Sequence, residues 1–345
     1  MVHSPLLNTN TTTTATMGNL ISQQFVRLPY PTTSFSGKTV IVTGSNTGLG
    51  KEAARHFARL GAAKLILAVR NTAAGNAAKK DIEDTTSCGP SVIEVWHLDL
   101  SSYDSVRAFA KRATDDLPRV DVLMENAGIA TFKWDIAEGH ERTVTVNVLS
   151  TFLLAFLMLP KLRATAKEFK TSPTLTIVSS EVHGMSKFPE WKEANTFDAL
   201  DDQSQTDFKE RYPTSKLLEV LAVRAMVPRM LQQGGGGETA GGSSVTVNYL
   251  NPGLCHSELA REGGLTFTIL KFLFARSTEV GSRTLVAAAA AGPKSHGKYM
   301  TDAKVNDGAL SSFVRSEDGK KATEKVWKEL VEILEKAEPG VCRNL

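Results

Sequence analysis

The chain has 345 residues, with 40 lysines and arginines against 37 aspartates and glutamates, which gives a net charge of +3. Hydrophobic residues make up 41% of it and 26 residues are glycine, proportions that are usual for globular domains and exclude a disordered chain or a collagen-like fibre. The near balance of charge predicts no broad basic surface, so nucleic acid is not an expected partner. The three cysteines, Cys88, Cys255 and Cys342, have no C-x-x-C spacing, which argues for a reducing compartment and against a disulfide framework or a metal site.

Residues 1–37 precede the first predicted strand and are expected to form a disordered or loosely packed extension. They lack the basic and apolar regions of a secretory signal. Residues 17–22, M-G-N-L-I-S, would match a myristoylation pattern if translation started at Met17. No run reaches the roughly 18 unbroken apolar residues that span a bilayer. The longest, residues 151–160 and 265–274, are interpreted as a core helix and as an apolar flap or interfacial helix. We expect a cytoplasmic protein without a transmembrane segment, and peripheral membrane association is left open.

From residue 38 onward, strand-like and helix-like segments alternate. The predicted strands are β-branched or apolar runs at residues 39–42, 64–69, 92–98, 120–124, 175–178 and 245–250. The predicted helices lie at residues 50–60, 73–82, 103–113, 144–162, 213–231 and 318–336. Most strands are continuously apolar rather than alternating, which is typical of strands buried on both faces. The order predicts an α/β fold, with a single doubly wound parallel sheet of Rossmann type and helices on both faces, in one domain at residues 38–338.

A glycine-rich string, T-G-S-N-T-G-L-G at residues 43–50, lies where the first strand ends and the first helix begins. Glycines there permit a tight turn and let backbone N–H groups approach a pyrophosphate, whose negative charge the helix N-terminus favours. Because the string lies within a βαβ unit, it predicts a dinucleotide site. The expected cofactor-binding residues of this string are Gly44, Ser45, Asn46, Thr47, Gly48, Leu49 and Gly50.

The spacing G-x-x-x-G-x-G resembles that of the short-chain dehydrogenase/reductase superfamily. Further strings follow in the family's order over roughly residues 38–257, namely Asp99, Asn126-Ala127-Gly128, Asn147, Ser180, Tyr212-x-x-x-Lys216 and Asn251-Pro252-Gly253. The resemblance implies that the cofactor is also contacted by Asp99, Asn126, Tyr212, Lys216, Pro252, Gly253 and Ser257. The strings L-A-V-R-N and S-S-E-V-H are similar to those of retinol dehydrogenase-like members and of fungal reductases of secondary metabolism.

Arg70 bears on the choice of cofactor. NAD enzymes place an acid about 20 residues after the glycines to bind the ribose 2′-hydroxyl, whereas a 2′-phosphate needs a cation. Here Val69 takes the position of the acid and Arg70 follows, able to form charge-assisted bonds with a phosphate. The next acid, Asp81, lies too far into the following helix to take over. The sequence therefore predicts NADP(H), and the alternative that Arg70 only solvates the strand end stays open.

Tyr212 and Lys216 lie four residues apart on a predicted helix and so share one face. The pKa of free tyrosine is near 10, and a neighbouring ammonium and a positively charged nicotinamide both favour the phenolate. The resemblance implies that Tyr212 protonates the carbonyl oxygen as hydride arrives, and that Lys216 binds the nicotinamide ribose. It also implies that Ser180, with Ser179 in reserve, holds the substrate oxygen, and that Asn147 supports a water and proton path to Lys216. The alternatives are an ordinary helix-surface pair for Y-x-x-x-K and a buried amide bound only to helix backbone for Asn147.

The segment between Ser180 and Tyr212 is longer than in the plain family pattern, which implies an insertion at about residues 184–211. It is partly apolar, and we expect it to form one wall of the substrate pocket. The apolar residues 259–274 would form the other wall, or else pack on the core or on a partner subunit. Because apolar pockets bury apolar ligands, the expected substrate is a lipophilic carbonyl or alcohol.

The leading hypothesis is an NADP(H)-dependent oxidoreductase that interconverts a carbonyl and an alcohol on a lipophilic small molecule, in secondary-metabolite biosynthesis. The alternative is a non-catalytic, NADP-sensing binding protein on the same fold. An extended-type epimerase is disfavoured by the glycine spacing, and a Ser-His-Asp hydrolase using His183 lacks the G-x-S-x-G elbow. His183 is instead expected to border the pocket or to be a satisfied loop histidine. A homodimer is left open, and the sequence specifies neither the substrate nor the direction and stereochemistry of the reaction.

Overall fold

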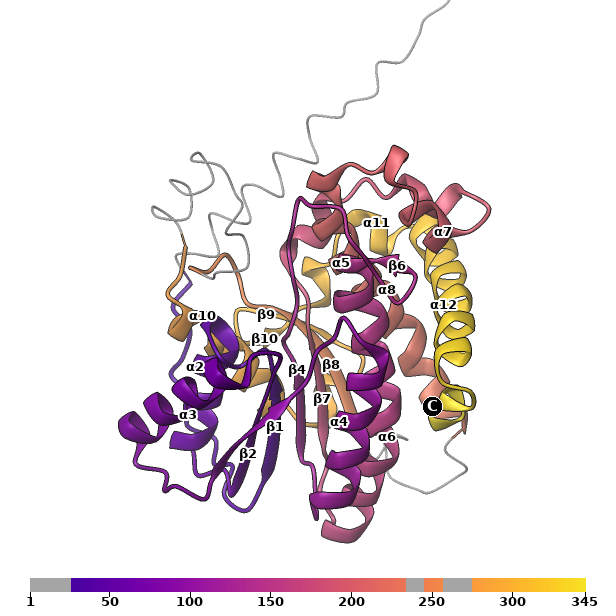
Figure 1. Cartoon of the computed structure of the whole chain (residues 1–345). Coiled ribbons are helices and arrows are strands. Elements are labelled where there is room, and N and C mark those ends of the chain that lie inside the picture. The colour runs from indigo at the N-terminus through magenta and orange to yellow at the C-terminus, as the bar shows by residue number, and fades with distance from the viewer. Residues whose placement is uncertain (1–25, 234–244, 257–274) are drawn as a thin grey trace, which may run out of the picture.

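The computed structural model describes residues 26–233, 245–256 and 275–345. Their centre is an eight-stranded sheet in the order β10-β9-β8-β7-β4-β1-β2-β3 (Figure 1). Its strands are β1 (Thr39–Thr43), β2 (Lys64–Val69), β3 (Ile93–His97), β4 (Val122–Glu125), β7 (Thr174–Val178), β8 (Thr246–Asn251), β9 (Tyr299–Thr301) and β10 (Lys304–Val305). All neighbours are parallel except β9 and β10. A separate ribbon pairs β5 (Ile136–Ala137) with β6 (His140–Glu141). The predicted doubly wound α/β fold is confirmed.

Helices cover both faces of the sheet (Figure 1). One face carries α2 (Gly48–Arg59), α3 (Thr72–Thr86) and α10 (Thr278–Ala290). The other carries α4 (Tyr103–Asp116), α6 (Ser150–Phe169), α8 (Phe208–Gln233) and α12 (Glu317–Ala337). Side chains along β1 alternate between these two layers, since Val40 and Val42 pack in one cluster and Ile41 in the other. Burial on both faces explains why the strand sequence is continuously apolar.

The order of the strands creates a switch point beside β1, where the direction in which strands are added to the sheet reverses. From β1 the chain goes to β2 and β3 on one side of the sheet, and then returns to β4 on the opposite side of β1. Ligands of doubly wound sheets bind at such a switch point, beyond the carboxyl ends of the strands. Because β1, β4, β7 and β8 are parallel, the residues that follow each of them lie along this same edge.

The predicted helix at residues 144–162 is not one regular helix. It consists of α5 (Arg142–Val144), a π-helical turn η1 (Thr145–Leu149) and α6, and it continues to Phe169. π-Helical turns are frequent at functional sites, and this one contains Asn147. The whole segment Arg142–Phe169 is long and apolar enough to cross a membrane, but 89% of its apolar window is buried inside the fold. It is the core helix that the sequence predicted.

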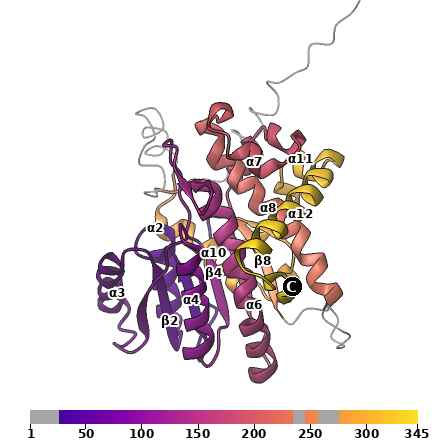
Figure 2. The same ribbon diagram turned by 45° about the vertical axis from the view of Figure 1, so that its right-hand side comes forward.

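The predicted insertion contains four short helices, η2 (Glu181–Met185), η3 (Pro189–Lys192), α7 (Thr196–Leu200) and η4 (Gln203–Gln205). Of these, η3 and α7 contact α12, and α7 lies near α11 (Ser312–Arg315) in Figure 2. The backbone N–H of Thr196 donates to the Glu329 carboxylate at 2.9 Å, and the Phe188 ring packs edge-on against Phe313. The insertion is therefore anchored to the end of the chain. Its role as a pocket wall stays a prediction.

Three short turns and the end of the N-terminal extension complete the described chain. Short 3-10 turns are η6 (Pro293–Ser295), η7 (Asp307–Ala309) and η8 (Val341–Asn344). Most of the predicted N-terminal extension lies outside the described residues, but its end is packed rather than loose. Phe35 is fully buried, with its ring 4.8 Å from that of Phe57.

Candidate active site

The glycine string forms the turn between β1 and α2. Gly44 and Gly48 have φ angles of 64° and 60°, which are unfavourable for other residues. A Cβ on Gly50 would lie 2.5 Å from the Asn126 amide nitrogen and 2.6 Å from the Gly44 carbonyl oxygen, so this glycine is required by close packing. The sequence therefore places glycine where the backbone must turn sharply and where two segments touch.

The start of α2 fits an anion. Thr47 is its N-cap residue but accepts no hydrogen bond with its side chain, and the first turn contains no acidic residue. By contrast, α3, α4, α10 and α12 all begin with a side chain that accepts from a backbone N–H. The first N–H groups of a helix need acceptors. The phosphate oxygens of a dinucleotide would supply them here, next to a loop with room for a close approach.

Hydrogen bonds within the glycine loop and to the end of β4 hold the loop in its conformation. Ser45 donates its buried hydroxyl to the carbonyl oxygen of Val42 at 2.8 Å. The Thr43 hydroxyl oxygen accepts the N–H groups of Asn126 and Ala127 at 3.0 and 2.9 Å. The Asn126 amide donates back to the Thr43 carbonyl oxygen at 2.9 Å. Ser45 and Asn126, both predicted to contact the cofactor, thus hold the shape of the loop.

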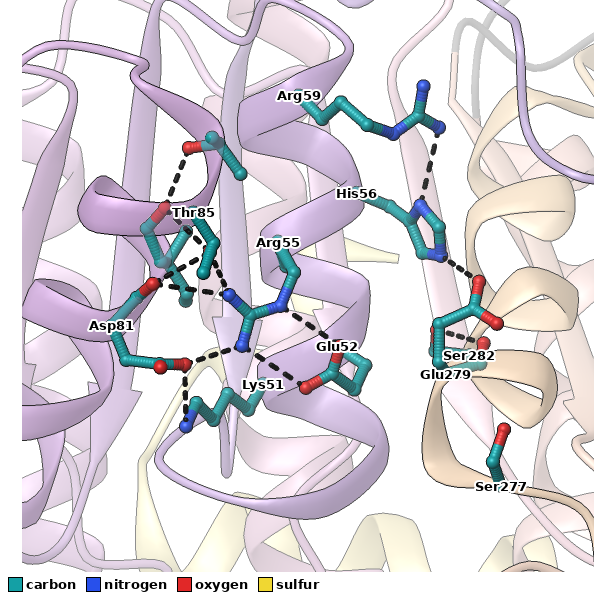
Figure 3. Close-up of polar contacts among 12 residues, drawn as sticks. Lys51, Glu52, Arg55, His56, Arg59, Asp81, Thr85, Ser277, Glu279 and Ser282 are labelled. Carbon is teal, nitrogen blue, oxygen red and sulfur yellow. Dashed lines mark hydrogen bonds and ion pairs between the residues drawn. The ribbon is translucent and has the colours of Figure 1, made fainter.

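At the end of β2, Arg70 is exposed and directly precedes Asn71, the N-cap residue of α3. The competing acid Asp81 is already engaged, because Lys51 and Arg55 of α2 bind its carboxylate at 2.9 and 2.5 Å (Figure 3). The hydrogen bond from Arg55, with that from Lys51, lowers the pKa of Asp81 to about 2. Asp81 therefore serves to join α2 to α3, as its distance from the strand end suggested.

Asp99, Pro252 and Gly253 follow the ends of β3 and β8. The Asp99 carboxylate accepts the backbone N–H of Ser101 at 2.9 Å and so shapes its own turn. Gly253 has a φ angle of 82°, and its N–H donates to the Asn251 side chain at 2.9 Å. Pro252 is buried. Ser257 and the apolar residues 259–274 lie outside the described residues.

The four predicted catalytic side chains come together from three parts of the fold. Tyr212 and Lys216 lie on α8, Ser180 follows β7, and Asn147 lies in η1. The Ser180 side chain lies close enough to the Tyr212 hydroxyl to favour its ionisation, an effect that burial of the phenol outweighs, so that the pKa of Tyr212 is raised. The Lys216 ammonium lies 5.9 Å from the centre of the Tyr212 ring. A hydroxyl, a phenol and an ammonium are therefore gathered at the carboxyl edge of the sheet, beside the glycine loop.

Asn147 joins two parts of this group. Its side-chain nitrogen donates to the Ile129 carbonyl oxygen and to the Ser215 hydroxyl, both at 2.9 Å. Its side-chain oxygen accepts the Ile129 N–H at 2.8 Å. The amide is thus bound to a loop and to α8, rather than to helix backbone alone. It fixes the loop after β4 against the helix that carries Tyr212 and Lys216.

The two serines after β7 have different surroundings. Ser179 is buried and donates its hydroxyl to the Lys216 carbonyl oxygen at 2.9 Å, which anchors α8 to the strand. Ser180 is only partly buried, and its hydroxyl oxygen accepts the Val182 N–H at 3.4 Å. Its contact with the Tyr212 hydroxyl makes Ser180 the better placed of the two to meet a substrate oxygen.

His183 is a satisfied loop histidine. Its Nδ1 donates to the Ser180 carbonyl oxygen at 2.7 Å, and its Nε2 accepts the Ser311 N–H at 3.2 Å. Burial lowers the pKa of His183, which favours this neutral form. Because both ring nitrogens are bound to backbone groups, His183 has no free nitrogen to act as the base of a hydrolase.

Two acids were missed by the sequence reasoning. Glu219 pairs with the Lys216 ammonium at 2.7 Å, and Glu125 is buried at the end of β4. Burial raises the pKa of Glu219 to about 7 against the opposing effect of Lys216. Burial and the charge of Glu219 raise the pKa of Glu125 well above its ordinary value. The signal that could have revealed Glu219 is its spacing of three residues from Lys216, which puts both on one helix face.

Comparison with known proteins agrees with this geometry. The family model for short chain dehydrogenases matches residues 38–187. The chain is 50% identical to the short chain dehydrogenase/reductase dmxR8 of Cryptosporiopsis sp. (strain 8999), over 95% of this chain and 100% of that protein. It is 45% identical to the short-chain dehydrogenase anuD of Penicillium roqueforti (strain FM164), over 98% of this chain and 88% of that protein.

Among solved structures, the fold is similar to that of the Pseudomonas aeruginosa RhlG/NADP active-site complex. The TM-score is 0.57 at 19% identity, and the match covers 79% of this chain and 96% of that one. The fold, the order of motifs and the similarity to these fungal relatives lead to one conclusion. The chain belongs to the short-chain dehydrogenase/reductase family.

Proposed function

We propose that this protein is an NADP(H)-dependent oxidoreductase that interconverts a carbonyl and an alcohol on a lipophilic small molecule. Membership of the family supports the reaction class. The observation that carries the proposal is the grouping of Tyr212 with Ser180 and Lys216 at the carboxyl edge of the sheet. The NADP-sensing alternative has no comparable support, because its usual sign is the loss of Tyr212 or Lys216.

The proposed roles follow from the positions of the side chains. The nicotinamide cofactor supplies a hydride to the carbonyl carbon, or accepts one from the alcohol. The Ser180 hydroxyl orients the substrate oxygen, and the Tyr212 Oη gives its proton to that oxygen in reduction and takes it back in oxidation. Lys216 stabilises the negative charge that Tyr212 acquires when it gives up the proton. Asn147 and Ser179 hold the elements on which these groups lie.

The preference for NADP(H) rests on Arg70. This cation is exposed at the end of β2, where an acid would bind the 2′-hydroxyl of NAD. Asp81 is held by Lys51 and Arg55 and is not free to replace that acid. The structurally similar RhlG is described with NADP in its active site, which agrees with the proposal.

A lipophilic substrate is supported by apolar side chains on segments that adjoin the catalytic residues along the chain. Phe132 and Met185 are exposed, in the loop after β4 and in η2. The Trp134 ring packs edge-on against Phe208, which lies one helical turn before Tyr212 on α8. Exposed apolar residues on such segments are suited to contact an apolar ligand. With the fungal relatives, they support a role in secondary-metabolite biosynthesis.

We assign the protein to the cytoplasm. Within the described residues Cys88, Cys255 and Cys342 form no disulfide, and we propose a reducing compartment for the protein. A homodimer stays a prediction. In the described residues, the face of α8 turned away from the sheet already carries α12 of the same chain (Figure 2).

The test is NADPH oxidation with a panel of lipophilic ketones and aldehydes, comparing the parent protein with Tyr212→Phe. The matched control is Tyr30→Phe, which removes the hydroxyl of an exposed tyrosine. We expect turnover in the parent and the control, and a loss of at least 100-fold in Tyr212→Phe. Equal turnover in all three would remove Tyr212 from the mechanism. Binding of NADPH without turnover of any carbonyl would instead favour the sensing protein.

A further inference from the structure

Three ionisable side chains are buried together behind the catalytic group. Lys216, Glu219 and Glu125 are only 4%, 2% and 4% exposed. The Lys216 ammonium donates to Glu219 at 2.7 Å and to the Val178 carbonyl oxygen at 2.9 Å. Glu125 lies at the end of β4, close enough for its charge to interact with that of Glu219. Each of the two acids has one side-chain oxygen without a hydrogen-bond partner among the described residues.

The charges of this group identify which acid holds a proton. One ammonium cannot balance two carboxylates, and an uncompensated charge in a buried place is strongly unfavourable. Glu219 is the acid that contacts the ammonium, so above its pKa of about 7 it is the carboxylate of the pair. Glu125 has no contact with Lys216 and is raised in pKa by burial and by the charge of Glu219. Glu125 is therefore the protonated acid.

The ion pair with Glu219 changes the effect of Lys216 on the ionisation of Tyr212. The titratable groups that interact with Glu219 are Lys216 and Tyr212 on its own helix and Glu125 on β4. An isolated ammonium near a phenol favours the phenolate. Here the carboxylate of Glu219 opposes that effect, and burial together with the charge of Glu219 raises the pKa of Tyr212.

We propose that Glu219 is a positioning residue that holds the Lys216 ammonium at the end of β7 and, by opposing its charge, keeps the Tyr212 phenol protonated in the cofactor-free protein. The inference rests on the proposed roles of Tyr212 and Lys216. It implies that the protein is prepared to donate a proton, as the reduction of a carbonyl requires. Oxidation of an alcohol would need the phenol to lose that proton first, which the positive charge of a bound oxidised nicotinamide would favour.

The experiment is an ultraviolet titration of tyrosine in the cofactor-free protein. The curve of Tyr212 is the difference between each protein and the same protein with Tyr212→Phe. Glu219→Gln removes the charge that faces Lys216, whereas Glu125→Gln replaces a neutral acid by a neutral amide of the same shape. We expect Glu219→Gln to lower the ionisation midpoint of Tyr212 by about one pH unit or more. Glu125→Gln should leave it in place.

A third variant tests whether Glu125 replaces the charge of Glu219 when Glu219 is neutral. If Glu125 ionises beside Lys216 once Glu219 is neutral, the double variant Glu125→Gln/Glu219→Gln removes that carboxylate too and shows the full shift. An unchanged midpoint in the double variant would overturn the proposal, as would an equal shift in Glu125→Gln alone. The titration needs neither cofactor nor substrate, so its result is independent of the turnover test of Tyr212.

A second measurement does not require a Glu219 variant to fold. At a pH high enough to ionise Glu219, whose pKa is raised to about 7, the infrared spectrum of the parent protein should still contain the carbonyl band of a buried, protonated carboxylic acid. That band should be missing from Glu125→Gln. Its absence from the parent would show that both acids are ionised, and would contradict the assignment of charges on which the proposal depends.

Discussion

Asn126 donates its side-chain amide to the backbone oxygen of Thr43 at 2.9 Å, which ties the end of β4 to the glycine loop after β1. The two strands flank the switch point of the sheet, so this bond fixes the geometry of the cofactor cradle from within the protein. Gly50 packs against the same amide. The cradle is thus held by contacts that any larger residue at Gly50 would break.

Two glycine variants separate packing from backbone strain. In Gly50→Ala the new methyl group would meet the Asn126 amide and the Gly44 carbonyl oxygen, whereas at Gly48 it would meet open space. We expect Gly50→Ala to lower the free energy of unfolding by about 1–3 kcal/mol through overpacking, and to abolish measurable NADPH binding. Gly48→Ala should cost about 1 kcal/mol, from its positive φ alone. Chemical denaturation and NADPH fluorescence titration measure the two effects, and equal losses in both variants would contradict the packing argument.

Arg70→Asp should reverse the choice of cofactor. The substitution removes the cation and places a carboxylate where a 2′-phosphate would lie, so the affinity for NADPH should fall by about 10- to 100-fold. The affinity for NADH should be unchanged or should rise. Lys328→Asp, a charge reversal at an exposed position on α12, is the control. An unchanged ratio of the two affinities would remove Arg70 from cofactor recognition.

His183→Ala tests whether the loop after β7 depends on the two hydrogen bonds of the imidazole. Without His183, the Ser180 carbonyl oxygen and the Ser311 N–H lose their partner. We expect a decrease in kcat of about tenfold or more, because small displacements of reacting groups have large effects on rate. NADPH affinity should change little. His183→Gln, which can replace one of the bonds, should be intermediate, and an Ala variant with the kcat of the parent would disprove the dependence.

Glu125 should make stability fall as the pH rises. Its pKa in the folded protein is raised above the ordinary value, so the folded state keeps a proton that the unfolded state loses above about pH 4.5. This stabilisation is fully present below that pH and is lost progressively toward the higher folded value, by up to about 1.4 kcal/mol per pH unit. Glu125→Gln cannot titrate, so its stability should depend less on pH between 5 and 8. Urea unfolding at several pH values compares the two proteins, and parallel pH profiles would show that Glu125 is ionised in both states.

Trp327 anchors α12 to the core. Its ring lies 6.0 Å from that of Phe156 on α6, and the Arg229 guanidinium of α8 lies 5.3 Å from it. Trp327→Ala should lower the free energy of unfolding by about 3–5 kcal/mol, as expected for a large buried aromatic residue. Thermal unfolding measures the loss. Lys328→Ala, at the next and exposed position, should change the midpoint by little, and a similar midpoint in both variants would mean that α12 packs loosely.

Most of the sheet could be predicted from the sequence because its strands share one pattern of residues. Runs such as residues 39–42 are apolar on both faces, and each is followed by turn residues at the edge where ligands bind. The roles of the glycines could also be predicted, because sharp turns and close backbone contacts accept few residues other than glycine. Local patterns of this kind are sufficient for six of the eight strands of the sheet, for the cradle and for the placing of Tyr212 and Lys216 on one helix. They did not reveal α10 or the short strands β9 and β10.

Other features depend on contacts that no local pattern contains. The π-helical turn at Asn147 arises within a segment whose apolar spacing fits a regular helix. Glu125 appears in the sequence as an ordinary acid before Asn126, and only the packing of β4 on α8 buries it beside Glu219. The sequence left two roles open for His183, because its hydrogen-bond partner Ser311 is 128 residues away along the chain.

The packing of α12 on α8 also has a consequence for the order of folding. Arg229 and Glu324, which join the two helices by an ion pair, are 95 residues apart in the sequence. Contacts of such long range form late, after the loop between them has closed. Until then, the face of α8 that later receives Trp327 remains open to water, so a chain interrupted before α12 would expose an apolar surface and be prone to aggregate. The helix that carries the reactive phenol thus depends on a distant part of the chain for its completion.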